Sequence, residues 1–157
     1  MSPPDSPSTR QSATPHATTI YTGSLKGGDY RRLAADDNAF YEVSSTTCAR
    51  IADWYARIGG VANGLGSLQI TYSGKASETC DQSLYVDNWT TGVWVALDAR
   101  AVGTTEIPTV TSVGGTLADY VSGATGDGEV AVRIRCTRAD AKNVATRGDL
   151  LRVTFTK

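Results

Sequence analysis

Apolar and polar residues alternate with a period of two along several stretches of the chain, which is the pattern of β-strands with one buried face. The clearest stretch is 130–136, whose apolar side chains share one face: Val130, Val132, Ile134 and Cys136. Residues 68–73 and 151–156 repeat this alternation. The pattern therefore predicts three strands here, each with one face in a hydrophobic core.

Weaker alternation between clusters of turn residues predicts further strands. Residues 84–89 and 93–97 flank Thr90-Thr91-Gly92, where a glycine suits the left-handed position of a hairpin loop. The other predicted strands are residues 40–44, 51–58 and 106–113, and short helical turns are expected only at residues 117–121 and 140–144. About eight strands at this spacing predict an all-β fold, a two-sheet antiparallel β-sandwich.

The start of the chain has a different composition. Four of the five prolines lie within the first fifteen residues, among Ser, Thr and Asp and without apolar periodicity. Such a stretch buries too little apolar surface to offset the entropy of ordering it. We therefore interpret residues 1–18 as an extended arm or linker and residues 19–157 as the β-sandwich domain.

Charge and motif content exclude several classes of function. The 15 Lys and Arg balance 16 Asp and Glu to a net charge of −1, so no general field attracts nucleic acid. No apolar run approaches the ~20 residues of a membrane span, and we expect no membrane insertion. His16, the single histidine, falls in the arm and is poorly placed for a catalytic triad. We predict that the chain is not an enzyme; a pair of glycosidase carboxylates is the catalytic alternative.

An acidic stretch is the best candidate for a metal site. Asp36, Asp37 and Asn38, together with Glu42, offer the oxygen ligands that Ca²⁺ prefers. Asp127 and Glu129 form a second, weaker candidate. The same residue types also build turns without any ion. A structural calcium ion at Asp36, Asp37, Asn38 and Glu42 is therefore one expectation, and a plain turn is the other.

Aromatic residues in the predicted hairpin are candidates for ligand binding. Strict alternation places Trp89 on the same strand face as Asp87, and Trp94 on the same face as Asp98. An exposed indole can stack on a sugar ring while a neighbouring carboxylate accepts its hydroxyl groups. We therefore predict a carbohydrate site at Trp89, Trp94, Asp87 and Asp98. The competing interpretation is that these rings belong to the core.

The three cysteines, Cys48, Cys80 and Cys136, allow one disulfide and leave one thiol. A bridge between Cys80 and Cys136 is favoured because both flank well-defined strands, and such a bridge suits an extracellular domain. No spacing typical of zinc or redox motifs is present. Three reduced thiols in an intracellular protein are the alternative.

Several motifs resemble one known group of proteins in their order and spacing. They are residues 33–43 (LAADDNAFYEV), 53–55 (DWY), 68–75 (LQITYSGK), 88–98 (NWTTGVWVALD), 119–123 (DYVSG) and 148–151 (GDLL). From about residue 21 to the end, the chain resembles jelly-roll-like β-sandwich accessory modules of secreted bacterial multidomain proteins. The resemblance implies a non-catalytic module, and sandwiches of this kind serve sugar binding, adhesion or architecture.

We therefore expect a non-catalytic extracellular module that binds carbohydrate or another surface polymer. The alternative is a structural subunit of a virion or surface filament, in which the N-terminal arm packs on a neighbouring copy and so drives self-assembly. An arm docked on a neighbour would favour the subunit, whereas a groove lined by Trp89 or Trp94 would favour the binding module.

Overall fold

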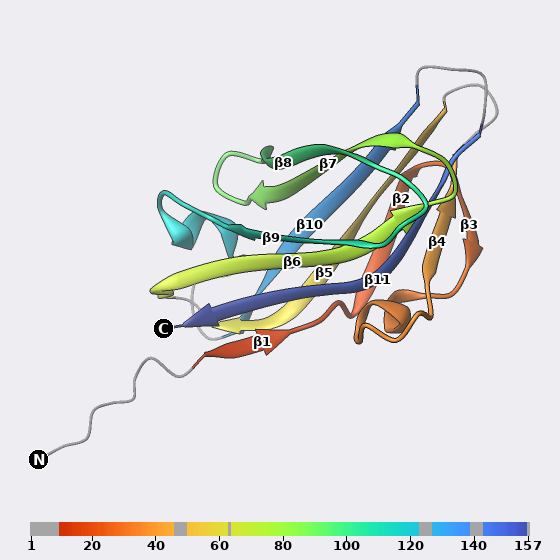
Figure 1. The fold of residues 1–157 in the computed structure, drawn as a ribbon. Helices are drawn as coiled ribbons and strands as arrows, with labels where there is room; N and C mark the ends of the chain where they lie inside the picture. Colours follow the sequence, from red (N-terminus) through yellow and green to blue (C-terminus); the bar gives the residue numbers. More distant parts are fainter. Residues whose placement is uncertain (1–9, 46–49, 63, 123–126, 139–142, 157) are drawn as a thin grey trace, which may run out of the picture.

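The strands form two facing antiparallel sheets, as Figure 1 shows. The alternating apolar residues meet between these sheets. The structure is a computed structural model that describes residues 10–156 except 46–49, 63, 123–126 and 139–142. In this part of the chain, eleven strands and only two 3₁₀ turns are present. The predicted all-β, two-sheet architecture is confirmed, with more strands than the eight expected.

The first sheet, sheet A, has the strand order β3-β4-β11-β6-β9, and β1 also pairs with β11. Its strands are β1 (Gln11–Ala13), β3 (Ser24–Gly27), β4 (Tyr41–Ser44), β6 (Ser67–Ala76), β9 (Ile107–Ser112) and β11 (Ala145–Thr156). A short 3₁₀ turn, η2 (Tyr30–Leu33), connects β3 to β4 and buries Leu33. Every pair in the sheet is antiparallel.

The second sheet, sheet B, has the order β2-β5-β10-β7-β8. Its strands are β2 (Ala17–Thr22), β5 (Ile51–Ala62), β7 (Cys80–Asn88), β8 (Val93–Val102) and β10 (Asp127–Thr137). The second 3₁₀ turn, η3 (Leu117–Tyr120), follows β9. None of the described helices is long and apolar enough to cross a membrane.

The core lies between the inner faces of the sheets. The alternation in β10 predicted its buried face: Val130, Val132, Ile134 and Cys136 are all fully buried. Trp54 from β5 is the largest buried side chain and packs edge-on against Tyr41, with ring centroids 4.8 Å apart. Its indole N–H donates to the Thr146 hydroxyl at 3.0 Å, so the one polar group of this buried side chain has a hydrogen-bond partner.

Part of the segment interpreted as an extended arm or linker, residues 1–18, forms strands of the sandwich. Residues 1–9 lie outside the described part, but Gln11–Ala13 pair with β11 in sheet A and residues 17–22 pair with β5 in sheet B. Both strands form through backbone hydrogen bonds at places where Ser, Thr and Gln replace apolar residues. Apolar periodicity could not reveal them, because they add little to the core.

The predicted hairpin forms between β7 and β8. Gly92 adopts φ +72°, and its N–H donates to the Asn88 carbonyl at 2.8 Å. The Asn88 side chain also accepts the N–H groups of Thr90 and Thr91. These contacts fix the turn that carries Trp89. The predicted turn at 117–121 corresponds to η3, whereas most of 140–144 lies outside the described residues.

A disulfide joins Cys80 of β7 to Cys136 of β10, the pair that the sequence favoured. The two Cα atoms are 5.7 Å apart, and the bridge closes a loop with a sequence separation of 56. Both cysteines are buried. Cys48 lies outside the described residues.

Candidate functional site

An aromatic cluster covers the outer face of sheet B. Tyr21 of β2 lies 5.0 Å from Tyr55 of β5, and Tyr55 lies 5.5 Å from Trp94 of β8, measured between ring centroids. The rings of Tyr21 and Trp94 meet edge-on at 6.4 Å, and the Trp94 indole N–H donates to the Tyr21 hydroxyl at 3.3 Å. Three strands therefore contribute to one continuous aromatic surface, which we call the aromatic platform.

The platform extends from one edge of sheet B to the other. Tyr21 and Trp94 come from β2 and β8, which are the two edges of the sheet. Across a flat sheet, four strand spacings would separate these edges by about 19 Å. The rings nevertheless touch, so the side chains lean inward over the middle strands. Ala131 of β10 lies beneath them and is almost completely buried although it faces outward.

One register shift and one regular strand pair place these side chains. Tyr21 is the extra residue at a register shift between Ile20 and Thr22, so it turns outward beside Tyr55. On the other side of the sheet, Trp94 pairs directly with Asp87 of β7 and shares its face. The ladder thus brings Asp87 to the rim of the platform.

The ion pair between Arg133 and Asp53 lies against the aromatic platform. The Arg133 guanidinium donates to both carboxylate oxygens of Asp53, at 2.8 and 2.5 Å. The same guanidinium lies over the rings of Tyr21 and Tyr85, at 4.7 and 5.4 Å from their centroids. The Asp53 hydrogen bond, more than any other contact, raises the pKa of Arg133. The cation is thereby fixed, which restrains the rings that rest on it.

A depression of about 290 Å³ opens on the platform. Its wall consists of Tyr21, Tyr55, Arg57, Asp87, Trp89, Gly92, Trp94 and Ala131. Among the charged residues of this wall, Arg57 faces Glu129 at 3.6 Å, and Glu129 also contacts His16 at 2.5 Å. His16 therefore has a hydrogen-bond partner on the surface of the domain.

Asp87 is the one carboxylate in the wall of this depression, and it is half-buried. Within the described residues, no hydrogen-bond donor or cation contacts its carboxylate. Burial raises the pKa of Asp87 because water solvates its charge less well. An unpaired acceptor beside aromatic rings is the combination that a hydroxyl-rich ligand can satisfy.

The structure brings together three of the four predicted ligand residues. Trp89 has 37% of its surface exposed, and its backbone N–H donates to the Asp119 carbonyl at 2.7 Å. It lines the depression with Trp94 and Asp87. Asp98 does not join them, because the register of β7 and β8 shifts between Leu84 and Tyr85 and places it opposite Leu84. Its carboxylate instead pairs with Arg100 at 2.8 Å.

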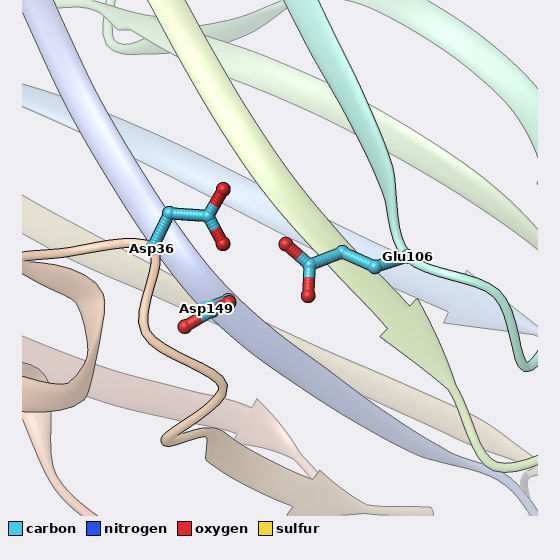
Figure 2. A group of neighbouring side chains, drawn as sticks. All are labelled: Asp36, Glu106 and Asp149. Carbon is cyan, nitrogen blue, oxygen red and sulfur yellow. The ribbon is translucent and has the colours of Figure 1, made fainter.

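The predicted metal residues separate into two places. Asp36 lies beside Glu106 and Asp149, and carboxylate oxygens of the three residues are all within 4.8 Å of one another (Figure 2). Asp37 and Asn38 contribute backbone N–H groups that donate to Asp149 at 3.1 Å. Glu42 does not share this cluster, since its carboxylate contacts Arg147 at 3.0 Å and Lys26 at 3.6 Å. The acidic cluster that could bind a metal is therefore Asp36, Glu106 and Asp149.

The second acidic candidate is also divided. Glu129 is engaged by His16 and Arg57, and the side chain of Asp127 is outside the described part. The residues that sequence reasoning missed are Tyr21, Glu106 and Asp149. Tyr21 lies three positions beyond the end of the assigned arm, and Asp149 is 112 positions from its partner Asp37. No local spacing signals such contacts.

Two larger depressions lie over sheet A. One of about 420 Å³ includes Leu68, Ser112 and Thr154, and one of about 410 Å³ includes Ser12, Thr71 and Arg152. Neither wall contains an aromatic side chain. They lack the flat apolar surfaces that distinguish the depression on sheet B.

Comparisons with known proteins find similarity in structure alone. No protein-family model matches the chain, and no curated protein matches it. A solved single-residue mutant of a carbohydrate-binding module of family 29 is similar with a TM-score of 0.54 at 5% identity, covering 93% of this chain and 92% of that chain. Two mutants of the module CBM29-2 give TM-scores of 0.53 and 0.52 at 6% and 8% identity, over 93% and 92% of this chain and 90% of each of theirs. The resemblance to jelly-roll-like β-sandwich modules is thus confirmed as a resemblance of fold.

Proposed function

We propose that the chain is a non-catalytic carbohydrate-binding module and that its ligand lies in the depression on the outer face of sheet B. The aromatic platform is the observation that carries this proposal. Tyr21 is 50% exposed although its ring contacts the rings of Tyr55 and Trp94. Family 29 carbohydrate-binding modules of similar fold give independent support.

The chemistry of the depression suits a sugar. The C–H face of a pyranose is apolar and packs on tyrosine and tryptophan rings, while its equatorial hydroxyl groups need hydrogen-bond acceptors. Asp87 offers such an acceptor with no competing partner among the described residues. The ion pair between Arg133 and Asp53 contacts the rings and restrains them before a ligand arrives. Binding would therefore cost little side-chain entropy.

The same wall argues against glycoside hydrolysis. A glycosidase uses two carboxyl groups on either side of the scissile bond. Asp87 is the one carboxylate that lines this depression. We therefore assign binding without catalysis to this face.

We further propose an extracellular location. The Cys80–Cys136 disulfide is stable in oxidising compartments, and the sequence resembles modules of secreted bacterial proteins. The alternative role as a self-assembling subunit gains no support from the described part of the predicted arm. Its residues Gln11–Ala13 pair with β11 of their own chain, so they are not available to a neighbouring copy.

The proposal is tested by a glycan array on the purified chain, followed by calorimetry with the best ligand. Trp94→Ala and Tyr21→Ala should each weaken binding by about tenfold or more, equivalent to ~1.4 kcal/mol. Tyr30→Ala is the matched control, because this tyrosine lies in η2, outside the platform, and should leave affinity unchanged. No glycan binding by the wild-type chain, or equal affinity for Trp94→Ala, would refute the proposal.

A further inference from the structure

A second arginine of β10 lies beside the aromatic platform. Arg135 follows Arg133 by two residues, so the two side chains project from the same face of the strand, from positions about 7 Å apart. Across the ladder to β5, Arg133 pairs with Tyr55 of the platform, and Arg135 pairs with Asp53. Arg135 therefore lies one step along the outer face of sheet B from the proposed ligand site.

Two arginines share one carboxylate at this step. Asp53 accepts hydrogen bonds from Arg133 with both of its oxygens, at 2.8 and 2.5 Å. The Nε atom of Arg135 lies 3.6 Å from one of these oxygens, which is too far for a hydrogen bond. Since the charges of Arg133 and Asp53 cancel, Arg135 adds one positive charge in excess to this group.

Arg135 is also an incompletely satisfied hydrogen-bond donor. Its Nε atom is buried and has no hydrogen-bond partner among the described residues, although 40% of the side chain is exposed. Asp81 is the next acid along this face of β7 and is itself exposed, but it forms no described ion pair with Arg135. The charge of Arg135 is therefore accessible to an anion from outside the chain.

The neighbours of Arg135 on the side away from Asp53 are small. Ser83 of β7 pairs with Arg135, and Ala99 of β8 pairs with Ser83. In the adjacent pair, by contrast, the Tyr85 ring lies 5.4 Å from the guanidinium of Arg133. Aromatic rings thus cover Arg133, whereas no aromatic side chain pairs with Arg135.

The one carboxylate of the depression is far from Arg135. Asp87 lies four residues from Ser83 on β7, which is about 13 Å along the strand. This separation exceeds the Debye length of about 8 Å at physiological ionic strength. A single ligand could therefore donate a hydroxyl group to Asp87 and place an anionic group at Arg135.

We propose that Arg135 binds an anionic group, a carboxylate or a sulfate, of a glycan that stacks on the aromatic platform, so that the ligand is an acidic polysaccharide. This inference rests on the proposed carbohydrate function and adds the charge of the ligand to it. The planar guanidinium forms paired, charge-assisted hydrogen bonds with such oxyanions. The bound anion supplies the negative charge that Asp53, already held by Arg133, does not provide.

The test compares glycans in matched pairs that differ in charge. Polygalacturonate is measured beside its methyl ester, and dextran sulfate beside dextran, which separates the carboxylate from the sulfate. Each neutral glycan that binds in the array is also oxidised to its C6 carboxylate and measured again by calorimetry. We expect the acidic member of a pair to bind about tenfold more tightly than the neutral member, and this preference should shrink in 0.5 M NaCl, a salt concentration at which ionic attraction is screened.

Three variants assign the preference to Arg135. Arg135→Gln should bind acidic and neutral glycans within about twofold of each other and keep the wild-type affinity for the neutral ones. Arg135→Lys keeps the charge without the planar fork and should retain part of the preference. Arg100→Gln is the matched control, because it removes the same charge from edge strand β8, where Arg100 pairs with Asp98 at 2.8 Å, and should leave the preference unchanged.

The outcomes separate this inference from the proposed function. Binding of neutral glycans without any preference for acidic ones overturns the role of Arg135 and leaves carbohydrate binding intact. A preference that persists in Arg135→Gln, or that Arg100→Gln loses equally, also overturns it. If no glycan of either charge binds, the proposed carbohydrate function fails and this inference fails with it.

Discussion

Arg133 holds Asp53 with two hydrogen bonds, at 2.8 and 2.5 Å, while its guanidinium supports the ring of Tyr21 at 4.7 Å. One cation thus neutralises a buried acid and provides the base of the aromatic platform. Stability and ligand binding are coupled at this residue, and both should respond when it is changed.

Arg133→Ala should therefore destabilise the chain by about 3 kcal/mol, because it leaves the carboxylate of Asp53 buried without its main partner. Arg135→Ala is the control: Arg135 is more exposed and lies 3.6 Å from the same carboxylate, so its loss should cost under about 1 kcal/mol. Urea unfolding of both variants measures the difference. Equal losses would show that Arg133 has no special role.

Asp87 should make stability depend on pH in a definite direction. Burial raises its pKa in the folded chain, so between the ordinary and the raised value the folded state binds more protons than the unfolded state. Stability attributable to this group must then fall as pH rises through that window. Asp87→Asn should raise the unfolding midpoint at neutral pH, and the gain should disappear below about pH 4.

The same substitution should weaken binding to any glycan that the array identifies, because an amide has one neutral acceptor oxygen where the carboxylate has two charged ones. Asp98→Asn provides the comparison, since Asp98 pairs with Arg100 and does not line the depression. A loss of affinity in Asp98→Asn but not in Asp87→Asn would show that Asp98, and not Asp87, contacts the glycan.

Tyr72→Phe tests the unpartnered hydroxyl. This variant should be more stable than the wild type by about 1 kcal/mol, because the buried hydroxyl has no hydrogen-bond partner among the described residues and its removal relieves a desolvation cost. Tyr41→Phe should behave in the opposite way, losing about 1 kcal/mol, because the Tyr41 hydroxyl bonds to Thr18. Urea unfolding of the two variants and the wild type distinguishes these outcomes.

The Cys80–Cys136 disulfide should contribute about 4 kcal/mol, the loop-closure value for a sequence separation of 56. A Cys80→Ala/Cys136→Ala double variant should unfold at correspondingly lower urea concentration. The difference in unfolding free energy between this variant and the oxidised wild type gives the contribution directly. Identical urea midpoints for the two proteins would mean that the bridge adds no stability.

Alternation predicted the strands that bury one full face, and β10 shows why: its apolar residues follow a strict period of two. β1 and the first two residues of β2 were assigned to an arm because their identity as strands depends on backbone pairing with β11 and β5, which leaves little apolar signal. Asp98 was placed on the wrong face for a related reason. One register shift moves every residue beyond it to the opposite face of the strand, and no residue type in the sequence indicates where the shift occurs.

The candidate sites, like the strands, could be predicted only in part from the sequence. Trp89, Trp94 and Asp87 are close in sequence, so the hairpin alone brings them together. Tyr21 meets Trp94 because the side chains of the two edge strands lean over the middle strands, and this contact depends on the order of all five strands. Asp36 was found from its acidic neighbours, but Glu106 and Asp149 meet it through tertiary contacts that no spacing within the sequence encodes.

The pairing of β1 with the final residues of β11 also determines how the domain would respond to force. Gln11 lies opposite Phe155, so the first and last described strands meet at one end of the sandwich (Figure 1). Tension applied between Gln11 and Thr156 would act on the same end of this ladder and break its pairs one after another, as a zipper opens. Peeling β1 away would release about 10 Å of chain. The domain would then yield slightly under a small load before its core carries any tension.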